Sequence, residues 1–493
     1  MCLLITRLAA HAMNRGDYPA VICEQQGQLI SVSYSQLYQR VLDQVAYLQE
    51  QAPHCIALRS ENNLDWVVTD LAAMVAGIPI VPIPMFFSNN QIRHILAQSG
   101  CDLLIGDWDS EVTEDYHPSA ESQEQWLPGT AKLTFTSGSS GMPKGVCLSA
   151  THLDEVCMQL ASVIEHQTTV TKHLVMLPLS TLLENITGIY VPLWLGKTTV
   201  VLSGESVGLI GSSQLDPARF AQALQQHQPH SLVLTPAILQ LLLHLVAKQP
   251  QLAYSLDFVA VGGARVSAKL IDQARYLGIP VYEGYGLSEC GSVVTLNTPL
   301  HHKAGTSGQV LSHLQVRVNE QRELEVCGPK ALGYLGQPFT EPWLATGDLA
   351  QIDAQGFITI LGRRKNILIT SFGRNISPEW IESEAQIYPE LSRMIVVGEG
   401  QPHLSAWVCH ADPGRVQDAI AELNTNLPDY AQIKEIGVLN QWPVQEGWFT
   451  ANGRPVRHRI PAVGQQPCQH LHQLLADHLM IGSTTPFYEE TLR

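Results

Sequence analysis

The stretch "LTFTSGSSGMPKGVCLS", Leu133 to Ser149, indicates the fold more clearly than any other part of this sequence. Three glycines, four serines and two threonines surround a single lysine, Lys144. Alternating apolar residues precede and follow the loop, which predicts two short strands joined by a hydroxyl-rich turn. Glycines allow positive φ angles and a close approach of the backbone, and amides and hydroxyls can surround an anion. The stretch therefore predicts a loop that holds a polyphosphate, with Lys144 as the counter-charge.

A Walker A loop is the obvious alternative, but this sequence departs from the pattern G-x-x-x-x-G-K-[ST] at two positions. Pro143 stands in place of the second glycine, and Gly145 follows the lysine where a Ser or Thr would bind magnesium. The residues after Lys144 have the pattern of a strand, and the next helix is expected to start only near Thr151. The loop is thus a phosphate loop of another kind.

Length and composition limit the class of protein. A chain of 493 residues is too long for one core and predicts two or three domains. The 29 basic and 45 acidic residues give a net charge of −16, which argues against a nucleic-acid partner. The apolar runs are too short to cross a membrane, and the first residues are interpreted as a helix start rather than a signal peptide. Ten scattered cysteines without a C-x-x-C pair fit a reducing cytoplasm.

Hydrophobic periodicity predicts the organisation of the chain. Helical spacing and strand patterns alternate along the first part: helices at 37–50, 62–76, 217–227 and 237–248, and strands at 55–58, 78–83, 231–234 and 258–261. Such alternation predicts an α/β architecture with mostly parallel sheets covered by helices. Strands with polar turns are expected at 323–327 and 357–361. After "GRRKN" a small α+β pattern follows: helix 378–386, strands 394–398 and 405–409, and helix 415–424. We predict a large domain over 1–364, a small one over 365–463, and an extension over 464–493 with no assigned role.

Four further stretches share glycines, hydroxyls or charges with the phosphate loop. They are "VGGA" (261–264), "YEGYGLSE" (282–289), "LATGDL" (344–349) and "GRRKN" (362–366). In this order and together with the loop, they resemble the adenylate-forming superfamily, and the chain is most similar to its long-chain fatty acid–CoA ligases. The resemblance implies a large multi-layered α/β N-terminal domain and a small α+β C-terminal domain that rotates between two half-reactions.

The resemblance also implies the reaction, its cofactors and its partners. A carboxylate attacks the α-phosphate of ATP to give an acyl adenylate and pyrophosphate, with Mg²⁺ present. A thiol then attacks the activated carbonyl. CoA is the expected acceptor, because no carrier-protein domain with a phosphopantetheine serine follows; a separate acyl carrier protein is the alternative. A third alternative, outside the enzymes, is a homologue that binds adenylates but has lost efficient catalysis.

Site residues carry over from the family's motifs position by position. The resemblance implies that Lys144, Ser288, Glu289 and Arg454 are catalytic, that Glu289 binds Mg²⁺, and that Lys365 is the hinge. Asp348 is expected to accept from both ribose hydroxyls with help from Arg363, and Tyr285 to stack on adenine. The full set expected to bind nucleotide is Thr136, Ser137, Gly138, Ser139, Ser140, Gly141, Lys144, Gly262, Gly263, Ala264, Glu283, Gly284, Tyr285, Gly286, Leu287, Ser288, Asp348 and Arg363.

The pocket for the acid is less specific in sequence. The segment "LPLSTLLENITGIY" (177–190) matches the family's P-L-x-H motif, with Thr181 where an aromatic residue or histidine is usual. We expect Thr181, Gly263 and Gly286 to line the pocket. The neighbouring leucines and isoleucines at 182, 183, 186 and 189 either line it or belong to the core. No acidic residue marks a site for an α-amino group, so a fatty or other apolar acid is expected.

The largest departure from the family lies near the C-terminus. Members usually carry a lysine that bridges the carboxylate and the ATP phosphate, and the matching segment "TANGRPVR" has Arg454 instead. Arginine keeps the charge but is bulkier and prefers bidentate contacts. Three outcomes follow: Arg454 takes the role, Arg457 or another cation substitutes, or adenylation is slow. We favour the first.

Overall fold

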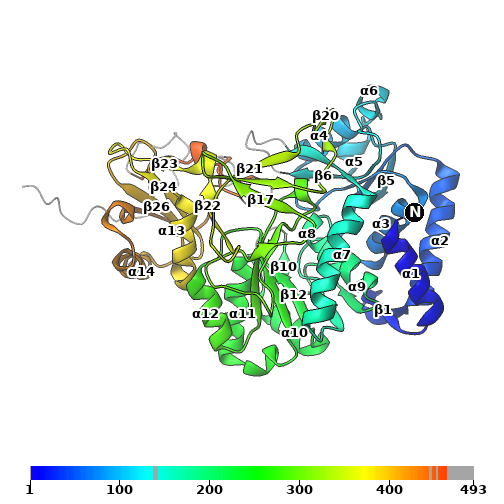
Figure 1. Ribbon diagram of the computed structural model, residues 1–493, viewed down its shortest axis with the longest axis horizontal. Helices are drawn as coiled ribbons and strands as arrows, with labels where there is room; N and C mark the ends of the chain where they lie inside the picture. Colours follow the sequence, from blue (N-terminus) through cyan, green and yellow to red (C-terminus); the bar gives the residue numbers. More distant parts are fainter. Residues whose placement is uncertain (1, 137–142, 212–213, 444–446, 451–453, 464–493) are drawn as a thin grey trace, which may run out of the picture.

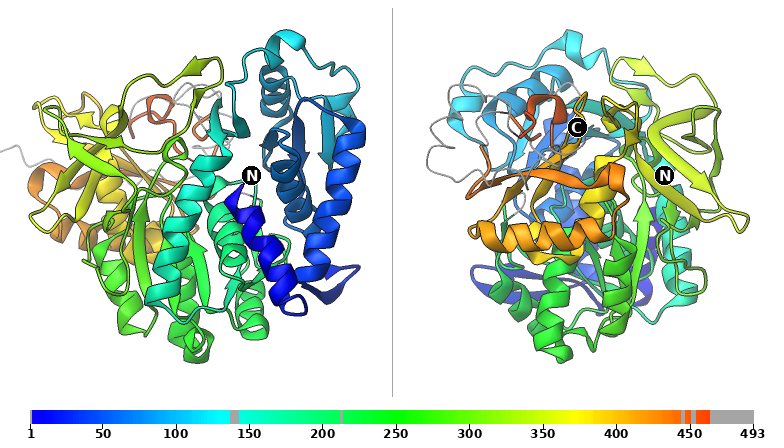
Figure 2. Two further views of the ribbon diagram at one scale, coloured as in Figure 1. Left: turned by 45° about the vertical axis from the view of Figure 1, so that its right-hand side comes forward. Right: turned by 90° about the vertical axis from the view of Figure 1, so that its left-hand side faces the viewer.

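The structure is a computed structural model that describes residues 2–136, 143–211, 214–443, 447–450 and 454–463. The N-terminal elements, from α1 (Leu3–Asn14) onward, form the larger part of the molecule. The elements from β23 onward lie together at the opposite end (Figure 1) and form a compact unit when viewed from that side (Figure 2). No helix in the described residues is both long and apolar enough to cross a membrane.

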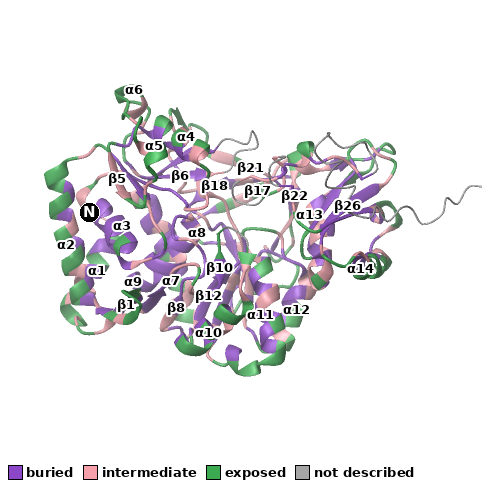
Figure 3. Cartoon of the chain, turned by 180° about the vertical axis from the view of Figure 1, so that it is seen from behind, coloured by how far each residue is buried: buried purple, intermediate pink, exposed green. Residues whose placement is uncertain are grey.

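A nine-stranded sheet forms the centre of the large part, in the order β16-β15-β14-β13-β12-β8-β9-β1-β2. Its strands from β1 to β14 pair in parallel, except for the β1–β2 hairpin. The inner strands are buried on both faces, as expected for a parallel sheet covered by helices (Figure 3). The strands are β1 (Pro19–Gln25), β2 (Gln28–Ser33), β8 (Lys172–Leu174), β9 (Thr198–Val201), β12 (Ser231–Leu234), β13 (Phe258–Val261), β14 (Val281–Tyr285), β15 (Thr295–Leu296) and β16 (Gln309–Val310).

A second, seven-stranded sheet contains the hairpin around the serine-rich loop. Its order is β20-β19-β7-β6-β4-β3-β5, with β6 and β7 antiparallel and Thr136 paired with Lys144. The two strands predicted around the loop are therefore confirmed, whereas residues 137–142 lie outside the described part. The strands are β3 (Ile56–Arg59), β4 (Ile80–Pro82), β5 (Leu103–Gly106), β6 (Thr130–Thr136), β7 (Lys144–Ser149), β19 (Gly333–Tyr334) and β20 (Gln337–Pro338).

Helices cover both sheets, and their starts follow local capping rules. Ser33 and Ser88 form capping boxes with Gln36 and Gln91, and Ser149 accepts from the backbone N–H of His152. The helices of the large part, with α1, are α2 (Tyr34–Gln51), α3 (Leu64–Ala76), α4 (Asn89–Ser99), α5 (Ser110–Thr113), α6 (Ala120–Gln123), α7 (Ala150–Gln167), α8 (Leu182–Glu184), α9 (Val191–Trp194), α10 (Pro217–His227), α11 (Pro236–Lys248) and α12 (Ala268–Tyr276).

Between α8 and α9 the chain forms a π-helix, η1 (Asn185–Tyr190), so that residues 182–194 are continuously helical. Two of its side chains reach a buried lysine. Lys132 Nζ donates to Asp70 (2.6 Å), to Tyr190 (2.7 Å) and to Asn185. Lys132 and Asp70 are at most 1% exposed, so this ion pair joins β6, α3 and η1 inside the core.

The remaining strands form smaller sheets. A four-stranded sheet, in the order β17-β18-β21-β22, precedes the C-terminal unit, whose three-stranded sheet is β25-β26-β27. These elements are β10 (Leu209–Ile210), β11 (Gln214–Leu215), β17 (Gln315–Val318), β18 (Glu323–Cys327), β21 (Trp343–Ile352), β22 (Ile358–Arg363), β23 (Leu368–Ile369), β24 (Asn375–Ile376), α13 (Pro378–Glu384), β25 (Met394–Val397), β26 (Leu404–Cys409), α14 (Pro413–Thr425) and β27 (Ile433–Leu439).

The C-terminal unit has its own core and a polar contact with the large part. Helices α13 and α14 and the three strands enclose a separate buried cluster. Across the contact, Gln386 accepts from the backbone N–H of Ser267 (3.0 Å) and donates to the carbonyl of Arg265 (2.8 Å). Gln240 also donates to the Gln386 carbonyl, and Lys269 lies 3.7 Å from Glu384. Such polar contacts fit a unit that can change its orientation.

Candidate active site

One cavity of about 1170 Å³ includes the carboxyl ends of the central strands, where open α/β sheets bind ligands, and continues along the sheet to residues such as Ser231 and Phe258. It brings together most of the residues predicted from the sequence, although they come from six separate stretches. Those that line it are Thr136, Lys144, Thr181, Gly262, Gly263, Ala264, Gly284, Tyr285, Gly286, Leu287, Ser288, Glu289, Arg363, Lys365 and Arg454. Ser137, Gly138, Ser139, Ser140 and Gly141 lie outside the described residues.

Asp348 lies behind the cavity wall and is held by two of the predicted residues. Arg363 Nε is 2.8 Å from Oδ1, and the Tyr285 hydroxyl donates to Oδ2 at 2.6 Å. Burial raises the pKa of Asp348, while Arg363 and the hydrogen bond from Tyr285 act in the opposite direction. The predicted ribose acceptor, its arginine and the predicted adenine-stacking tyrosine therefore form one connected group.

Glu283 lies apart from the main cavity. Its side chain lines a second cavity of about 200 Å³ with Arg265, Ser307 and Glu384, at the contact with the C-terminal unit. Burial raises the pKa of Glu283 to about 8, with Arg265 opposing the shift. Its neighbours Gly284 and Tyr285 do line the main cavity. The geometry therefore offers the backbone of this strand, rather than the Glu283 carboxyl group, to a nucleotide.

Glu289 meets the requirements of a magnesium ligand. The hydroxyl of Tyr334 donates to Oε1 at 2.8 Å, and Oε2 has no hydrogen bond to another described residue. Lys144 lies over the Tyr334 ring, 5.5 Å from its centroid. The described chain holds no cluster of three or more His, Cys, Asp or Glu side chains that could bind a metal. A single carboxylate suits Mg²⁺, which proteins commonly bind through one or two carboxylates together with substrate phosphates. Sequence reasoning missed Tyr334, because no motif surrounds it.

Glycine is needed at two positions in the cavity for different physical reasons. Gly263 has φ +80°, and a Cβ built there would meet nothing within 4 Å, so its backbone face is open to a planar ring. At Gly286 a Cβ would lie 1.8 Å from the carbonyl oxygen of Ser292. Gly263 therefore fits the expected passage of backbone along the adenine, whereas Gly286 is required by packing.

Arg454 points into the nucleotide end of the cavity from the C-terminal unit. Burial lowers its pKa and Arg363 acts in the same direction, while the charges of Asp348 and Glu289 raise it. A backbone hydrogen bond from Thr450 to the Arg454 carbonyl (2.8 Å) fixes the base of its turn. Arg457 is engaged elsewhere, since both of its Nη atoms donate to Glu382 (2.8 and 2.7 Å). Both arginines line the cavity, but the charges that act on Arg454 are those of Asp348 and Glu289, whereas Arg457 is held by Glu382.

Lys365 lies at the junction between the two parts and also lines the cavity. It belongs to a short 3₁₀ turn over Arg364–Asn366, directly after β22. Burial and the nearby charges of Arg363 and Arg454 lower its pKa. The hinge role of Lys365 stays a prediction.

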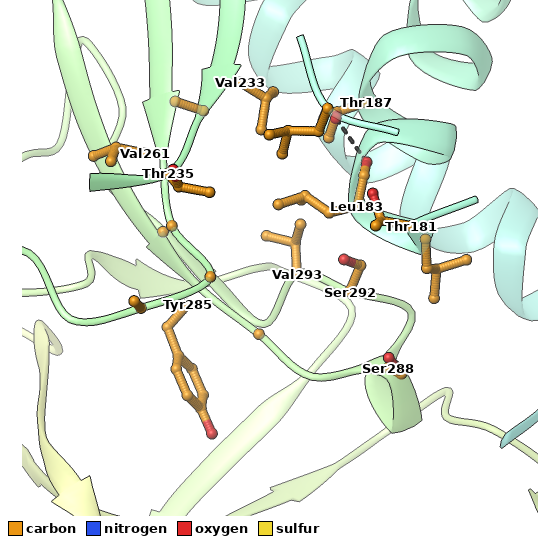
Figure 4. A pocket seen from close by; sticks show the side chains of 18 of the residues that line it. Thr181, Leu183, Thr187, Val233, Thr235, Val261, Tyr285, Ser288, Ser292 and Val293 are labelled. Atoms are coloured by element: carbon orange, nitrogen blue, oxygen red, sulfur yellow. Dashed lines mark hydrogen bonds between the residues drawn. The ribbon is translucent and has the colours of Figure 1, made fainter. Parts of the chain in front are cut away.

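The rest of the cavity is mostly apolar (Figure 4). Leu183, Val233 and Val293 point toward one another around the same space, and Tyr285 points away from them. Thr181 lies at the rim of this space, and Leu182 and Leu183 also line it. Ile186 and Ile189 are fully buried in the main core instead. Both alternatives left open by the sequence, lining the pocket or belonging to the core, therefore occur within one helical segment.

The fold and this site define an adenylate-forming enzyme of the α/β class. Comparison with known proteins agrees: the model of the AMP-binding enzyme family matches residues 8–336, and the chain belongs to this family. Family membership confirms the resemblance drawn from the sequence motifs. It also confirms the expected kind of enzyme, an AMP-forming acid–thiol ligase that uses ATP and Mg²⁺.

Two curated relatives illustrate the range of the family. The chain is 27% identical over 440 residues to the long-chain-fatty-acid–CoA ligase FadD15 of Mycobacterium bovis, covering 73% of each chain. It is 26% identical over 484 residues to the 2-succinylbenzoate–CoA ligase of Staphylococcus epidermidis, covering 92% of this chain and 96% of that one.

Solved structures confirm the predicted fold class. The o-succinylbenzoate CoA synthetase of Bacillus subtilis, in complex with its acyl-adenylate intermediate, superposes with a TM-score of 0.76 at 21% identity, covering 92% of this chain and 97% of that one. The anthranilate CoA ligase AuaEII, in complex with anthranoyl-AMP, gives 0.78 at 16% identity, covering 92% and 96%.

Proposed function

We propose that this protein joins a carboxylic acid with an apolar body to CoA through an acyl adenylate. One observation carries the proposal: a single cavity is lined at one end by residues suited to ATP and at the other by apolar side chains. A carboxylate entering from the apolar end would meet the α-phosphate near Ser288. The relatives named as CoA ligases support CoA as the acceptor.

The proposed mechanism depends on charge neutralisation, since two anions must meet at one phosphorus. Lys144, on β7, would bind the β- and γ-phosphates as the leaving pyrophosphate forms. Arg454 would bridge the substrate carboxylate and the α-phosphate, so that one guanidinium interacts with both negative groups. Mg²⁺, when bound by Glu289 and the phosphates, supplies further neutralisation of the developing charge. Tyr334 would orient Glu289 through its hydrogen bond.

The two half-reactions need two positions of the C-terminal unit. In the present arrangement Arg454 lies within the nucleotide end of the cavity, which corresponds to the adenylation step. Moving Arg454 out would open this side to the thiol of CoA. We propose 1–364 and 365–463 as the two bodies, with rotation at Lys365. The limited polar contact made by Gln386 supports a low cost for the movement.

The acid is proposed to be fatty or otherwise apolar. Leu183, Val233 and Val293 offer no charged partner, so a second carboxylate or an ammonium group near the reacting end would be buried at a high cost. The 2-succinylbenzoate relatives, which cover almost the whole chain, make an aryl acid the second candidate. The apolar lining favours the first candidate, because 2-succinylbenzoate carries a second carboxylate.

The test is a panel of acids in an ATP–pyrophosphate exchange assay, repeated with CoA or a purified acyl carrier protein and thioester detection. Exchange with straight-chain acids and thioester formation with CoA is the expected result. Exchange with 2-succinylbenzoate alone would replace the fatty acid by the aryl acid. Exchange followed by transfer only to the carrier protein would identify a loading enzyme. ATP binding without exchange for any acid would identify an adenylate-binding homologue and refute the proposal.

A further inference from the structure

The apolar end of the cavity runs along one face of the central sheet. Side chains of a strand alternate between faces, so residues two apart share a face. On β12 and the residue after it, Ser231, Val233 and Thr235 share one face, and on β13 and beyond Phe258, Ala260 and Gly262 do so. All six line the cavity, and Leu232 and Val261 also contribute to its lining. Register pairs Ser231 with Phe258 and Val233 with Ala260. The cavity wall is therefore built of successive rows across the sheet.

These rows change in chemistry with depth. The row at the carboxyl edge, with Thr235 and Gly262, adjoins the nucleotide end. The middle row, Val233 and Ala260, is apolar. The deepest row is His173, Ser231 and Phe258, which pair directly across β8, β12 and β13. A strand rises about 3.3 Å per residue, so the deepest row lies about 13 Å below Thr235.

The deepest row carries a hydrogen-bonded chain of three buried side chains. His173 Nδ1 is 2.9 Å from Ser231 Oγ, and Nε2 is 3.2 Å from Glu184 Oε1. All three are less than 6% exposed. Glu184 Oε2 has no hydrogen-bond partner in the described structure. A buried polar chain beneath the apolar row of Val233 and Ala260 is costly unless it serves packing or a ligand.

Either tautomer of His173 leaves Ser231 with unused hydrogen-bonding capacity toward the cavity. If His173 donates from Nδ1, the serine O–H remains a donor; if Nδ1 accepts, the serine lone pairs remain acceptors. Phe258, which pairs with Ser231, lies at the same depth and stacks on Tyr282 of the middle row, with the ring centroids 4.9 Å apart. The hydrocarbon chain of an acid that fills the apolar end of the cavity would therefore bring its last atoms to the Ser231 hydroxyl.

We infer that Ser231, positioned by His173 and Glu184, is a specificity-determining residue that binds an uncharged polar group at the far end of the acid. The inference rests on the proposed function and narrows its substrate class to acids with an apolar chain that ends in a hydroxyl or carbonyl oxygen. A distal carboxylate at Ser231 fits less well, because the adjacent His173 is already paired with the carboxylate of Glu184, which would repel a second anion.

The test compares straight-chain acids with ω-hydroxy acids of the same length, over a series of lengths. For the wild type, KM in the exchange assay is expected to be about three- to tenfold lower for the hydroxy acid at the length that reaches Ser231. Ser231→Ala should remove this preference by raising KM for the hydroxy acid, with kcat unchanged. Ser231→Thr, which keeps the hydroxyl, should retain it.

Val233→Ala is the matched control, since this residue lies two positions higher on the same face and carries no polar group. It is expected to change KM for both acids by the same factor. Binding of the two acids by calorimetry gives a readout that does not need turnover. If the wild type exchanged with no acid but bound the hydroxy acid more tightly in a Ser231-dependent manner, the proposed function would fail and the subsite would stand. An equal effect of Ser231→Ala on both acids, in KM and in binding, would overturn the inference.

Discussion

Removing the Arg454 side chain is the most direct test of the proposed mechanism. Arg454→Ala leaves the cavity without the cation whose pKa responds to both Asp348 and Glu289. One preorganised group of this kind in a water-excluded site accounts for about 100- to 1000-fold in rate. Arg454 keeps an exposed surface, so solvent screens part of its charge, and we expect a loss at the lower end of this range, about 100-fold, in ATP–pyrophosphate exchange. Arg454→Lys keeps the charge and should retain most of the activity.

The assay separates the two half-reactions. Thioester formation from a supplied acyl adenylate should be unaffected by Arg454→Ala, since the residue would have left the cavity by then. Arg415→Ala is the matched control: Arg415 belongs to the same unit, is 65% exposed and pairs with Glu390 at the surface, so its loss should change neither step. Arg457→Ala is unsuitable as a control, because it would leave the half-buried Glu382 without its partner. Equal exchange rates for wild type and Arg454→Ala would refute the assignment, and a faster Arg454→Lys would show that arginine limits the enzyme.

Three further outcomes are expected. Glu289→Gln should abolish most exchange and raise the Mg²⁺ requirement while leaving urea unfolding unchanged, and Tyr334→Phe should cost about tenfold through its lost hydrogen bond; an unfolded Glu289→Gln would instead indicate a structural carboxylate. Lys132→Met should lower the free energy of unfolding, measured by urea titration, by about 3–5 kcal/mol because Asp70 stays buried without its cation. Adding Asp70→Leu to Lys132→Met should restore much of the lost stability. Burial lowers the pKa of His152 from 6.5 to about 4, so between these pH values the unfolded chain binds more protons than the folded one. The free energy of unfolding should therefore fall as the pH drops from about 6.5 to about 4. An unchanged slope of this free energy against pH in His152→Leu would contradict this origin.

Sequence periodicity predicted much of the fold. Helix 217–227 and strands 231–234, 258–261 and 323–327 have the bounds seen in the structure. These segments have clear ends, such as the proline at 217 and the glycines at 262 and 263, which leave little room for error. Helix 415–424 is longer by two residues at its start, because Asp412 caps it before Pro413.

Site residues that belong to sequence motifs could be predicted. Residues that reach the site only through the tertiary fold could not. Lys144, Ser288 and Arg454 come from motifs and line one cavity. Tyr334 lies on a two-residue strand, and only the pairing of β19 with β7 brings it beside Lys144. Leu183 lines the cavity, Ile186 and Ile189 lie in the core, and Leu182 does both, a division that the sequence left open. The same segment also widens locally into a π-helix, which a 3.6-residue period does not predict.

That widening, the π-helix η1, constrains how this segment can vary in length. Asn185 and Tyr190 are five residues apart, and both reach Lys132. In an α-helix, which turns about 100° per residue, they would face directions about 140° apart, but the i→i+5 bonding of a π-helix brings them to one side. The segment thus carries one residue more than an α-helix would need to join α8 to α9. Deleting a single residue here would restore α-helical geometry, separate the two anchors and rotate Thr187 out of the cavity wall. Enzymes that keep this anchor pair should therefore tolerate substitutions at 186–189, between the anchors, far better than the loss of one residue.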